Sequence, residues 1–145
     1  MCDKMPTPHR PLFVELPFQV KTYDIDFAGH VSNIVYVRWL EELRLAMLES
    51  YLPLKEQIEG GVVPLLVESS VRYRVQIGLL AEVTGSMWVE DLTAVRVKVR
   101  AEFLHQGNVC VEAFQIGAFV NIQTGRPSRV PEEFRRQVSS SELVQ

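Results

Sequence analysis

Three polar side chains that can take part in catalysis stand close together early in the chain: Asp26, His30 and Asn33. A carboxylate can act as a base or a nucleophile, an imidazole as an acid or a hydrogen-bond partner, and a carboxamide can hold a carbonyl group or a water molecule. These residues belong to a turn that ends where a long apolar segment begins. If that segment is a helix, its start offers unpaired backbone N–H groups and a partial positive charge. We therefore expect a polarised carbonyl group at this helix start, attacked with the help of Asp26.

The helix that positions this turn is predicted to begin near Ser32 or Asn33, which are both favoured N-cap residues. It runs to about Tyr51, because Pro53 cannot continue it. Apolar residues fill most of its positions, so its apolar surface is too broad for a helix that lies on an open face of a protein. The rest of the chain is therefore expected to wrap around it.

The remainder of the sequence alternates between strand-like segments and short turns. Predicted strands cover Phe13–Tyr23, Val62–Gln76, Leu79–Trp88, Thr93–Leu104 and Val109–Ile122, with a connector at Leu54–Gly60, a turn at Glu90–Asp91 and one short helix at Pro131–Gln137. Short turns imply that neighbouring strands are antiparallel. The sequence thus predicts an α+β fold, in which an antiparallel sheet of about five strands wraps around one long central helix.

Composition limits the possible function classes. The 145 residues, 47% hydrophobic and 23% charged, are typical of one globular domain, which we place at residues 13–137 between a flexible arm, 1–12, and a frayed tail, 138–145. A net charge of −3 gives no reason to expect a nucleic-acid partner. No apolar run reaches the ~18 residues of a membrane helix, and the polar Met1–Pro11 segment does not look like a signal peptide, so a cytoplasmic location is expected.

Other catalytic chemistries lack their usual motifs. Cys2 and Cys110 form no Cys-x-x-Cys pair, and a disulfide framework is not expected from them. The three histidines lie far apart in sequence, so no metal set is predicted. Neither a Gly-x-Ser-x-Gly elbow nor a Walker-type loop is present. Water and a few polar groups suffice for the expected reaction, so no cofactor is predicted.

The order of elements and the sequence of the turn together resemble the hot-dog fold, in particular the 4-hydroxybenzoyl-CoA thioesterase family. The resemblance covers roughly Leu16 to Ile122, and Val67–Tyr73 is similar to the second strand of that family. Its specific part is Tyr-Asp-Ile-Asp-Phe-Ala-Gly-His-Val-Ser-Asn at Tyr23–Asn33, followed by Tyr36, Trp39, Glu41 or Glu42, and Arg44.

The resemblance implies hydrolysis of an acyl thioester carried on coenzyme A or on acyl carrier protein. Asp26 matches the catalytic aspartate of the family, as nucleophile or as general base, and the family's oxyanion donor, a backbone N–H, falls close to Asn33. Several relatives have histidine where this chain has Asn33, whereas its own histidine stands earlier, at His30. We therefore predict Asp26, His30 and Asn33 as catalytic residues.

Each candidate also has a purely structural interpretation. From its spacing alone, Asp26 suits a turn aspartate bonded to its own backbone, and His30 suits a residue that packs the loop. Asn33 is expected to be the N-cap whatever else it does. We predict that Tyr36 contacts the substrate, that Glu68 lines the acyl pocket, and that Arg72 and Arg74 contact coenzyme A phosphates. The alternative for Glu68 is an exposed position on the sheet edge, and the alternative for the two arginines is a solvated sheet face.

Two other function classes remain open at this point. One is a hydratase or dehydratase on acyl thioesters, and the other is a non-catalytic module that binds acyl thioesters. A homodimer or homotetramer is expected, because the long, valine-rich strands of an open sheet leave an edge that needs a partner. The resemblance implies the same, since hot-dog thioesterases have their sites at dimer interfaces.

Overall fold

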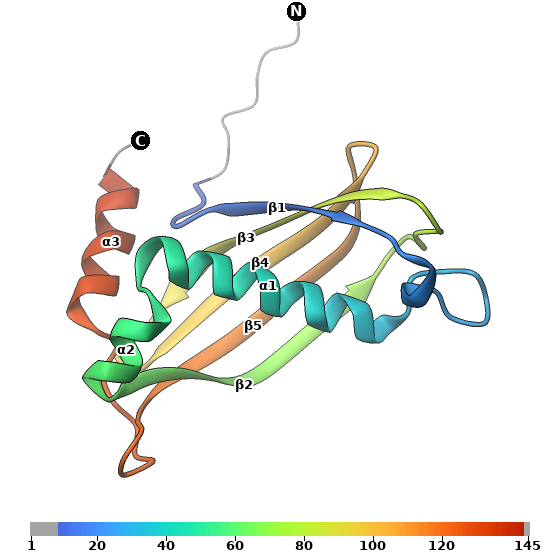
Figure 1. Cartoon of the computed structure of the whole chain (residues 1–145). Coiled ribbons are helices and arrows are strands. Elements are labelled where there is room, and N and C mark those ends of the chain that lie inside the picture. Colours follow the sequence, from blue (N-terminus) through green and yellow to red (C-terminus); the bar gives the residue numbers. More distant parts are fainter. Residues whose placement is uncertain (1–8, 144–145) are drawn as a thin grey trace, which may run out of the picture.

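The computed structural model describes residues 9–143. The elements in chain order are β1 (Val14–Gln19), a 3₁₀ turn (Thr22–Asp24), α1 (Asn33–Tyr51), α2 (Leu54–Gly60), β2 (Val62–Tyr73), β3 (Glu82–Leu92), β4 (Arg96–His105), β5 (Asn108–Asn121) and α3 (Glu132–Leu143). The strands form one antiparallel five-stranded sheet in the order β1-β3-β4-β5-β2. Figure 1 shows the sheet curving under α1, with α3 near the C-terminal end of that helix. The predicted fold class is confirmed.

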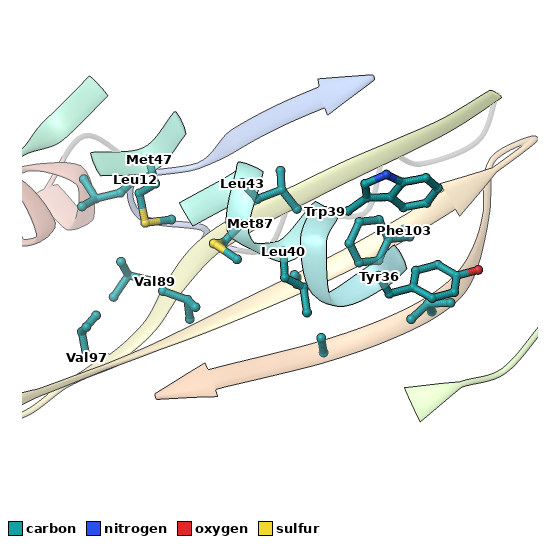
Figure 2. Close-up of a cluster of buried hydrophobic side chains, with 14 of the residues drawn as sticks. Leu12, Tyr36, Trp39, Leu40, Leu43, Met47, Met87, Val89, Val97 and Phe103 are labelled. Carbon is teal, nitrogen blue, oxygen red and sulfur yellow. The ribbon is translucent and has the colours of Figure 1, made fainter. Parts of the chain in front are cut away.

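One face of α1 and the inner face of the sheet form the core. Leu40 and Leu43 are fully buried, and each such leucine stabilises the fold by about 1.5–3 kcal/mol. The predicted alternation in β4 is correct, since Val97, Val99, Ala101 and Phe103 are buried against the helix layer. Figure 2 shows the side chains of α1 meeting those of β3 and β4 in this core.

The first half of α1 packs through an aromatic cluster. Trp39 stacks on Phe18 of β1 with ring centroids 4.9 Å apart, and Tyr36 lies 5.5 Å from Phe103. Beneath Phe18 the chain has Gly85, where a Cβ atom would lie only 2.6 Å from Phe18 Cε2. A glycine is therefore required at this position of β3 for Phe18 to reach the helix.

The wrapping of α1 is one-sided within a single chain, which differs from the sequence expectation. Ile34, Val37 and Leu45 are 60%, 48% and 46% exposed, so a second apolar face of the helix stays open. Strand β2 lies at one edge of the sheet and is also exposed over most of its length. A curved sheet can cover only the helix face that it supports.

Several predicted boundaries are wrong. The segment Leu54–Gly60 is helix α2, not a connector, and Glu90–Asp91 is not a turn, because β3 continues to Leu92 through an irregularity between Val89 and Asp91. Tyr23 belongs to the 3₁₀ turn and not to the first strand.

Both predicted ends of the domain also change. Within the expected frayed tail, α3 continues to Leu143 and buries Val138, and within the expected arm, Pro11 and Leu12 are buried. Residues 1–8 of the expected arm and 144–145 of the expected tail lie outside the described part of the chain. A few apolar residues that are buried by distant parts of the chain leave no periodic pattern in the sequence. The sequence therefore does not predict order in these two segments.

No helix within residues 9–143 is both long enough and apolar enough to cross a membrane.

Candidate functional site

Asp26 lies in a tight loop that joins the 3₁₀ turn to α1. Its Oδ1 accepts hydrogen bonds from the backbone N–H groups of Ala28, at 2.9 Å, and His30, at 3.2 Å. The backbone N–H of Asp26 donates to the carbonyl oxygen of His30 at 2.8 Å, and Gly29 N–H donates to the Asp26 carbonyl at 3.0 Å. Gly29 supports this loop with a φ of +82°, a conformation that glycine adopts without strain. The carboxylate is therefore held by one oxygen, while Oδ2 accepts no hydrogen bond from residues 9–143.

Backbone contacts anchor the loop on both sides. Ile25 and Val31 form an antiparallel bridge, and His30 forms another with Gly78. The N–H of Val31 donates to the carbonyl of Ile77 at 2.8 Å. The segment that follows β2 therefore holds the candidate catalytic loop in place.

The helix start differs in one residue from the prediction. Ser32 is the N-cap of α1 and Asn33 is its first helical residue, so the expected N-cap role of Asn33 is wrong. No side-chain hydrogen bond caps the helix. The N–H of Val35 bonds the carbonyl of Ser32 at 2.9 Å, which leaves the N–H groups ahead of it facing outward at the helix start. These donors and the helix dipole favour negative charge at this point.

His30 and Asn33 contribute to the site in different ways. His30 fixes Asp26 through its main chain, because its N–H is one of the two donors to the carboxylate. Its imidazole is half-buried and makes no hydrogen bond within the described residues. Asn33 is exposed at the start of α1, a few residues after His30. Asp26, His30 and Asn33 are thus brought to one end of α1, as the sequence predicts.

The predicted substrate-binding residues do not all lie at the Asp26 end of α1, and they do not share one face of the sheet. Tyr36 is 3% exposed and packs against Trp39, Phe103 and Tyr73, so within one chain it is a core residue. Burial raises the pKa of its hydroxyl well above the usual range. The pKa of Tyr73 is also raised by burial.

Arg72 of β2 and Arg74, which directly follows the strand, lie on the sheet face that points away from α1. Tyr73, between them, faces α1, since its ring lies 5.6 Å from that of Tyr36, and successive strand residues point to opposite faces. Arg74 pairs with Glu112 of β5 at 3.3 Å.

Glu68 lies on the same outer face, and this corrects its expected place in the acyl pocket. It stands opposite Ile116, whereas the next residue, Ser69, stands opposite Gln115 on the helix side. The irregularity of β2 between Leu66 and Glu68 changes which residues face the helix. A bulge of this kind has no reliable signal in a single sequence.

A cavity of about 230 Å³ lies between the second half of α1, the start of β2 and the strands β4 and β5. Its walls are mostly apolar and include Leu45, Leu48, Leu65, Val97 and Phe119. Gly117 of β5 also lines the cavity, at a position where a Cβ atom would lie 3.4 Å from Val97 Cγ1 and 3.6 Å from the carbonyl oxygen of Leu65.

Three polar side chains also line this cavity: Glu41, Arg44 and Gln115. Neither Arg44 nor Gln115 is among the site residues that the sequence predicts. A sequence signal exists for Gln115, since it occupies a position of the β5 alternation whose neighbours on the same face, Ala113 and Phe119, are buried and apolar. Burial lowers the pKa of the Arg44 guanidinium.

Within residues 9–143, no three histidine, cysteine, aspartate or glutamate side chains come together as a metal site. Cys110 is a free, buried thiol. The loop itself carries a carboxylate, an imidazole and backbone N–H donors.

Solved structures of similar shape show the same fold. A gentisyl-coenzyme A thioesterase is 22% identical with a TM-score of 0.75, over 84% of this chain and 99% of that chain. A DHNA-CoA thioesterase from Staphylococcus aureus is 18% identical with a TM-score of 0.79, over 92% of this chain and 91% of that chain. A hypothetical protein from Staphylococcus aureus in complex with CoA is 18% identical with a TM-score of 0.85, over 96% of this chain and 89% of that chain.

No curated protein sequence matches this chain. The model of the Thioesterase-like superfamily matches residues 20–138, which include the Asp26 loop, the central helix and all strands but the first. The chain therefore belongs to the Thioesterase-like superfamily, and this membership confirms the predicted hot-dog acyl thioester hydrolase.

Proposed function

We propose that Asp26 and the first turn of α1 form the catalytic centre, and that the substrate is an acyl thioester of coenzyme A. The observation that carries this proposal is the Asp26 carboxylate, held by Ala28 and His30 N–H groups through one oxygen, beside a helix start without a side-chain cap. A carboxylate fixed in this way is aimed by the loop and needs no reorganisation during the reaction.

In this proposal the thioester oxygen accepts hydrogen bonds from the first N–H groups of α1. The free oxygen of Asp26 either takes a proton from the water that attacks the carbonyl carbon or attacks that carbon itself. In both cases the carbon–sulfur bond breaks, the thiol leaves with a proton, and the acid is released after addition of one water molecule. The exposed Asn33 side chain and the His30 imidazole would contact the carbonyl or the water.

The test is thiol release from two matched substrates, hexanoyl-CoA and hexanoyl acyl carrier protein, followed by a series of acyl-CoAs of increasing chain length. We expect turnover of the CoA thioester to exceed turnover of the carrier-protein thioester. Binding of hexanoyl-CoA with no thiol release would favour the non-catalytic module instead.

Arg72 and Arg74 are proposed to contact the phosphates of coenzyme A. They are exposed, and Tyr73 between them packs against Tyr36 near the start of α1. Replacing both arginines with alanine is expected to raise KM for acyl-CoA while leaving kcat within about twofold, since phosphate contacts far from the carbonyl bind substrate and transition state equally. A KM that does not change would remove both residues from the site.

The active form is proposed to be a homodimer or a homotetramer in which two chains pair along β2. An unpaired edge of 12 residues is a template for another strand, and Leu65, Leu66 and Val67 are 52%, 45% and 50% exposed on it. The open apolar face of α1 includes Ile34, Val37 and Leu45, and Leu45 lines the same cavity as Leu65 and Leu66 of this edge. Pairing two copies would cover both surfaces at once.

Light scattering on Val67→Lys tests the dimer, with Ile58→Lys as its control. Both residues are about half exposed within one chain, at 50% and 54%, but Ile58 lies on α2 and not on the edge strand. We expect Val67→Lys to reduce the mass to that of a monomer and to lower turnover, while Ile58→Lys leaves both unchanged. A monomeric wild-type protein with full activity would contradict the proposal.

Membership of the 4-hydroxybenzoyl-CoA thioesterase family and a cytoplasmic location are part of the same proposal. The first is supported by the motif from Tyr23 to Asn33, and the second by the free thiol of Cys110, since reducing compartments keep thiols unpaired.

A further inference from the structure

Three large apolar side chains stand exposed on two loops at one end of the molecule, and we call them the apolar tip: Phe27, Leu79 and Leu80. Phe27 belongs to the segment that leads into α1 and is fully exposed. Leu79 and Leu80 belong to the segment between β2 and β3, and Leu80 is 70% exposed. Single exposed apolar residues are common on protein surfaces, whereas several that gather in one place mark an interaction site.

Main-chain contacts hold the two loops together. His30 and Gly78 form an antiparallel bridge, and the N–H of Val31 donates to the carbonyl of Ile77 at 2.8 Å. Val31 and Ile77 are both buried, so each loop is anchored in the core beside the other. Figure 1 shows both loops at the end of the molecule where α1 begins, with the loop before α1 projecting beyond the sheet. The apolar tip is therefore a projection of the surface on a fixed base.

Leu80 has a backbone conformation that disfavours leucine. Its φ is +66°, in the left-handed region, where a Cβ atom crowds the following carbonyl oxygen and glycine or asparagine is preferred. Because the side chain is mostly exposed, packing within its own chain does little to offset this strain. Strained residues of this kind gather at functional sites. The leucine is therefore kept at a cost to the stability of the fold, which favours a role for its side chain outside the chain.

The exposed charges of the two loops are mainly positive. Residues 20–32 and 74–81 carry two cations, Lys21 and Arg74, and both are exposed. Of the two carboxylates in these loops, Asp24 is buried, and Asp26 is half-buried and bonded to N–H groups of its own loop. Glu112, which pairs with Arg74, lies on β5. Apolar side chains that project beyond a cationic base suit an anionic lipid surface, which attracts the cations and takes up the apolar groups.

We propose that the apolar tip inserts into an anionic lipid surface, with its cationic base toward the headgroups. Lipids rearrange around a projection of any outline, whereas a protein partner needs a pocket of matching shape. In the proposed dimer, antiparallel pairing of β2 places the two tips at opposite ends of the paired strands, so one tip does not cover the other. Phe27 directly follows Asp26, so binding brings the candidate catalytic loop to the lipid surface. The inference goes beyond the proposed function and does not rest on it.

Cosedimentation with lipid vesicles tests the inference without any substrate. Wild-type protein is expected to bind vesicles of phosphatidylcholine mixed with phosphatidylglycerol more tightly than vesicles of phosphatidylcholine alone, and added salt should weaken this preference. Replacing both Leu79 and Leu80 with asparagine should lower the partition coefficient by at least about tenfold, the loss expected when apolar side chains no longer leave water. Asparagine adopts the left-handed conformation of residue 80 readily, so the urea midpoint should not fall.

Replacing Ile58 and Ile122 with asparagine is the matched control. Both isoleucines are about half exposed, like Leu79. They lie near the start of β2, because Ile58 is on α2 and the N–H of Ile122 donates to the carbonyl of Gly61. The 12 residues of β2 place this region about 40 Å from the segment that carries Leu79, at ~3.3 Å per residue. The partition coefficient of this control should equal that of wild type.

Phe27→Trp provides a gain of signal that does not depend on weakened binding. The two native tryptophans are poor reporters of the tip, since Trp39 is buried under Phe18 and Trp88 is half-buried on β3. Phosphatidylcholine with brominated acyl chains quenches only indoles that reach into the bilayer. We expect mixed vesicles that contain this lipid to quench the fluorescence of Phe27→Trp much more than that of wild type.

Three results would each overturn the inference: wild type that does not bind the mixed vesicles, an equal loss of binding in the two double variants, or Phe27→Trp fluorescence that the brominated lipid leaves unchanged. Light scattering without vesicles identifies the other occupant. If wild type binds no vesicles and the Leu79 and Leu80 variant has a lower mass than wild type, the inference is wrong and the apolar tip is an interface between copies of this chain.

Discussion

Replacing Asp26 with asparagine tests the proposed catalytic centre most directly, because the substitution removes the charge and keeps the shape. The asparagine Oδ1 can still accept hydrogen bonds from the N–H groups of Ala28 and His30, so the loop should be retained. The free energy of unfolding is expected to fall by less than about 1 kcal/mol, since the carboxylate is half-buried and only the charge-assisted part of the two bonds is lost. Turnover should fall by about 10²–10⁴, the range that a positioned base contributes.

Asp26→Ala separates the two roles of the side chain. It loses turnover to the same extent and also both loop hydrogen bonds, which together are worth about 1–3 kcal/mol in this half-exposed position. At ~2–4 °C per kcal/mol, the melting temperature should fall by roughly 2–12 °C. A rate loss common to both variants, with a stability loss confined to alanine, is the expected pattern.

Asp24→Asn is the control for these measurements. Asp24 is 5% exposed and its Oδ2 accepts the Lys21 N–H at 2.8 Å, so the change affects a buried carboxylate two residues from Asp26. Its thiol-release rate should stay within about threefold of wild type, because its side chain bonds the Lys21 N–H and makes no hydrogen bond to the Asp26 loop within the described residues. Thiol release, urea unfolding and thermal unfolding are measured on all three variants. The reasoning fails if Asp26→Asn folds and retains more than a tenth of wild-type turnover.

Three further substitutions follow from particular contacts. Asn33→Ala should change the free energy of unfolding by less than about 0.5 kcal/mol, because Ser32 and not Asn33 is the N-cap, so a fall in kcat measured beside an unchanged urea midpoint would show a catalytic contact. Gly85→Ala should destabilise the fold by about 1–3 kcal/mol, because the new Cβ would lie 2.6 Å from Phe18 Cε2, and an unchanged urea midpoint would show that Phe18 moves freely. Burial raises the pKa of Tyr36 above its unfolded value of 10.0, so the folded protein keeps a proton that the unfolded chain loses, and the free energy of unfolding should fall as the pH rises above about 10. In urea unfolding, the free energy of unfolding of Tyr36→Phe should fall less between pH 9 and 11 than that of wild type. An equal fall in both proteins would contradict the assignment of the pH dependence to Tyr36. An unchanged KM in the variant would assign Tyr36 to the core alone.

Much of the fold follows from local patterns in the sequence. The apolar run that Pro53 ends indicates the long helix, and the alternation from Val95 to Phe103 indicates a strand buried on one face. The polar turn before the helix brings Asp26, His30 and Asn33 within a few residues of one another, so any fold with a helix there places them at its start. These features depend on neighbours along the chain, which is why one sequence reveals them.

Other features depend on contacts between segments that are far apart in sequence, and only the tertiary structure decides them. The β2 irregularity turns Glu68 away from the helix, and pairing with β5 places Ser69 against Gln115. The cavity forms where the second half of α1, the start of β2, and the strands β4 and β5 meet, and it is lined by Arg44 and Gln115, which each have a buried polar atom without a hydrogen-bond partner within residues 9–143. Strand register and helix placement minimise the free energy of the whole chain, so no local pattern of residues determines them.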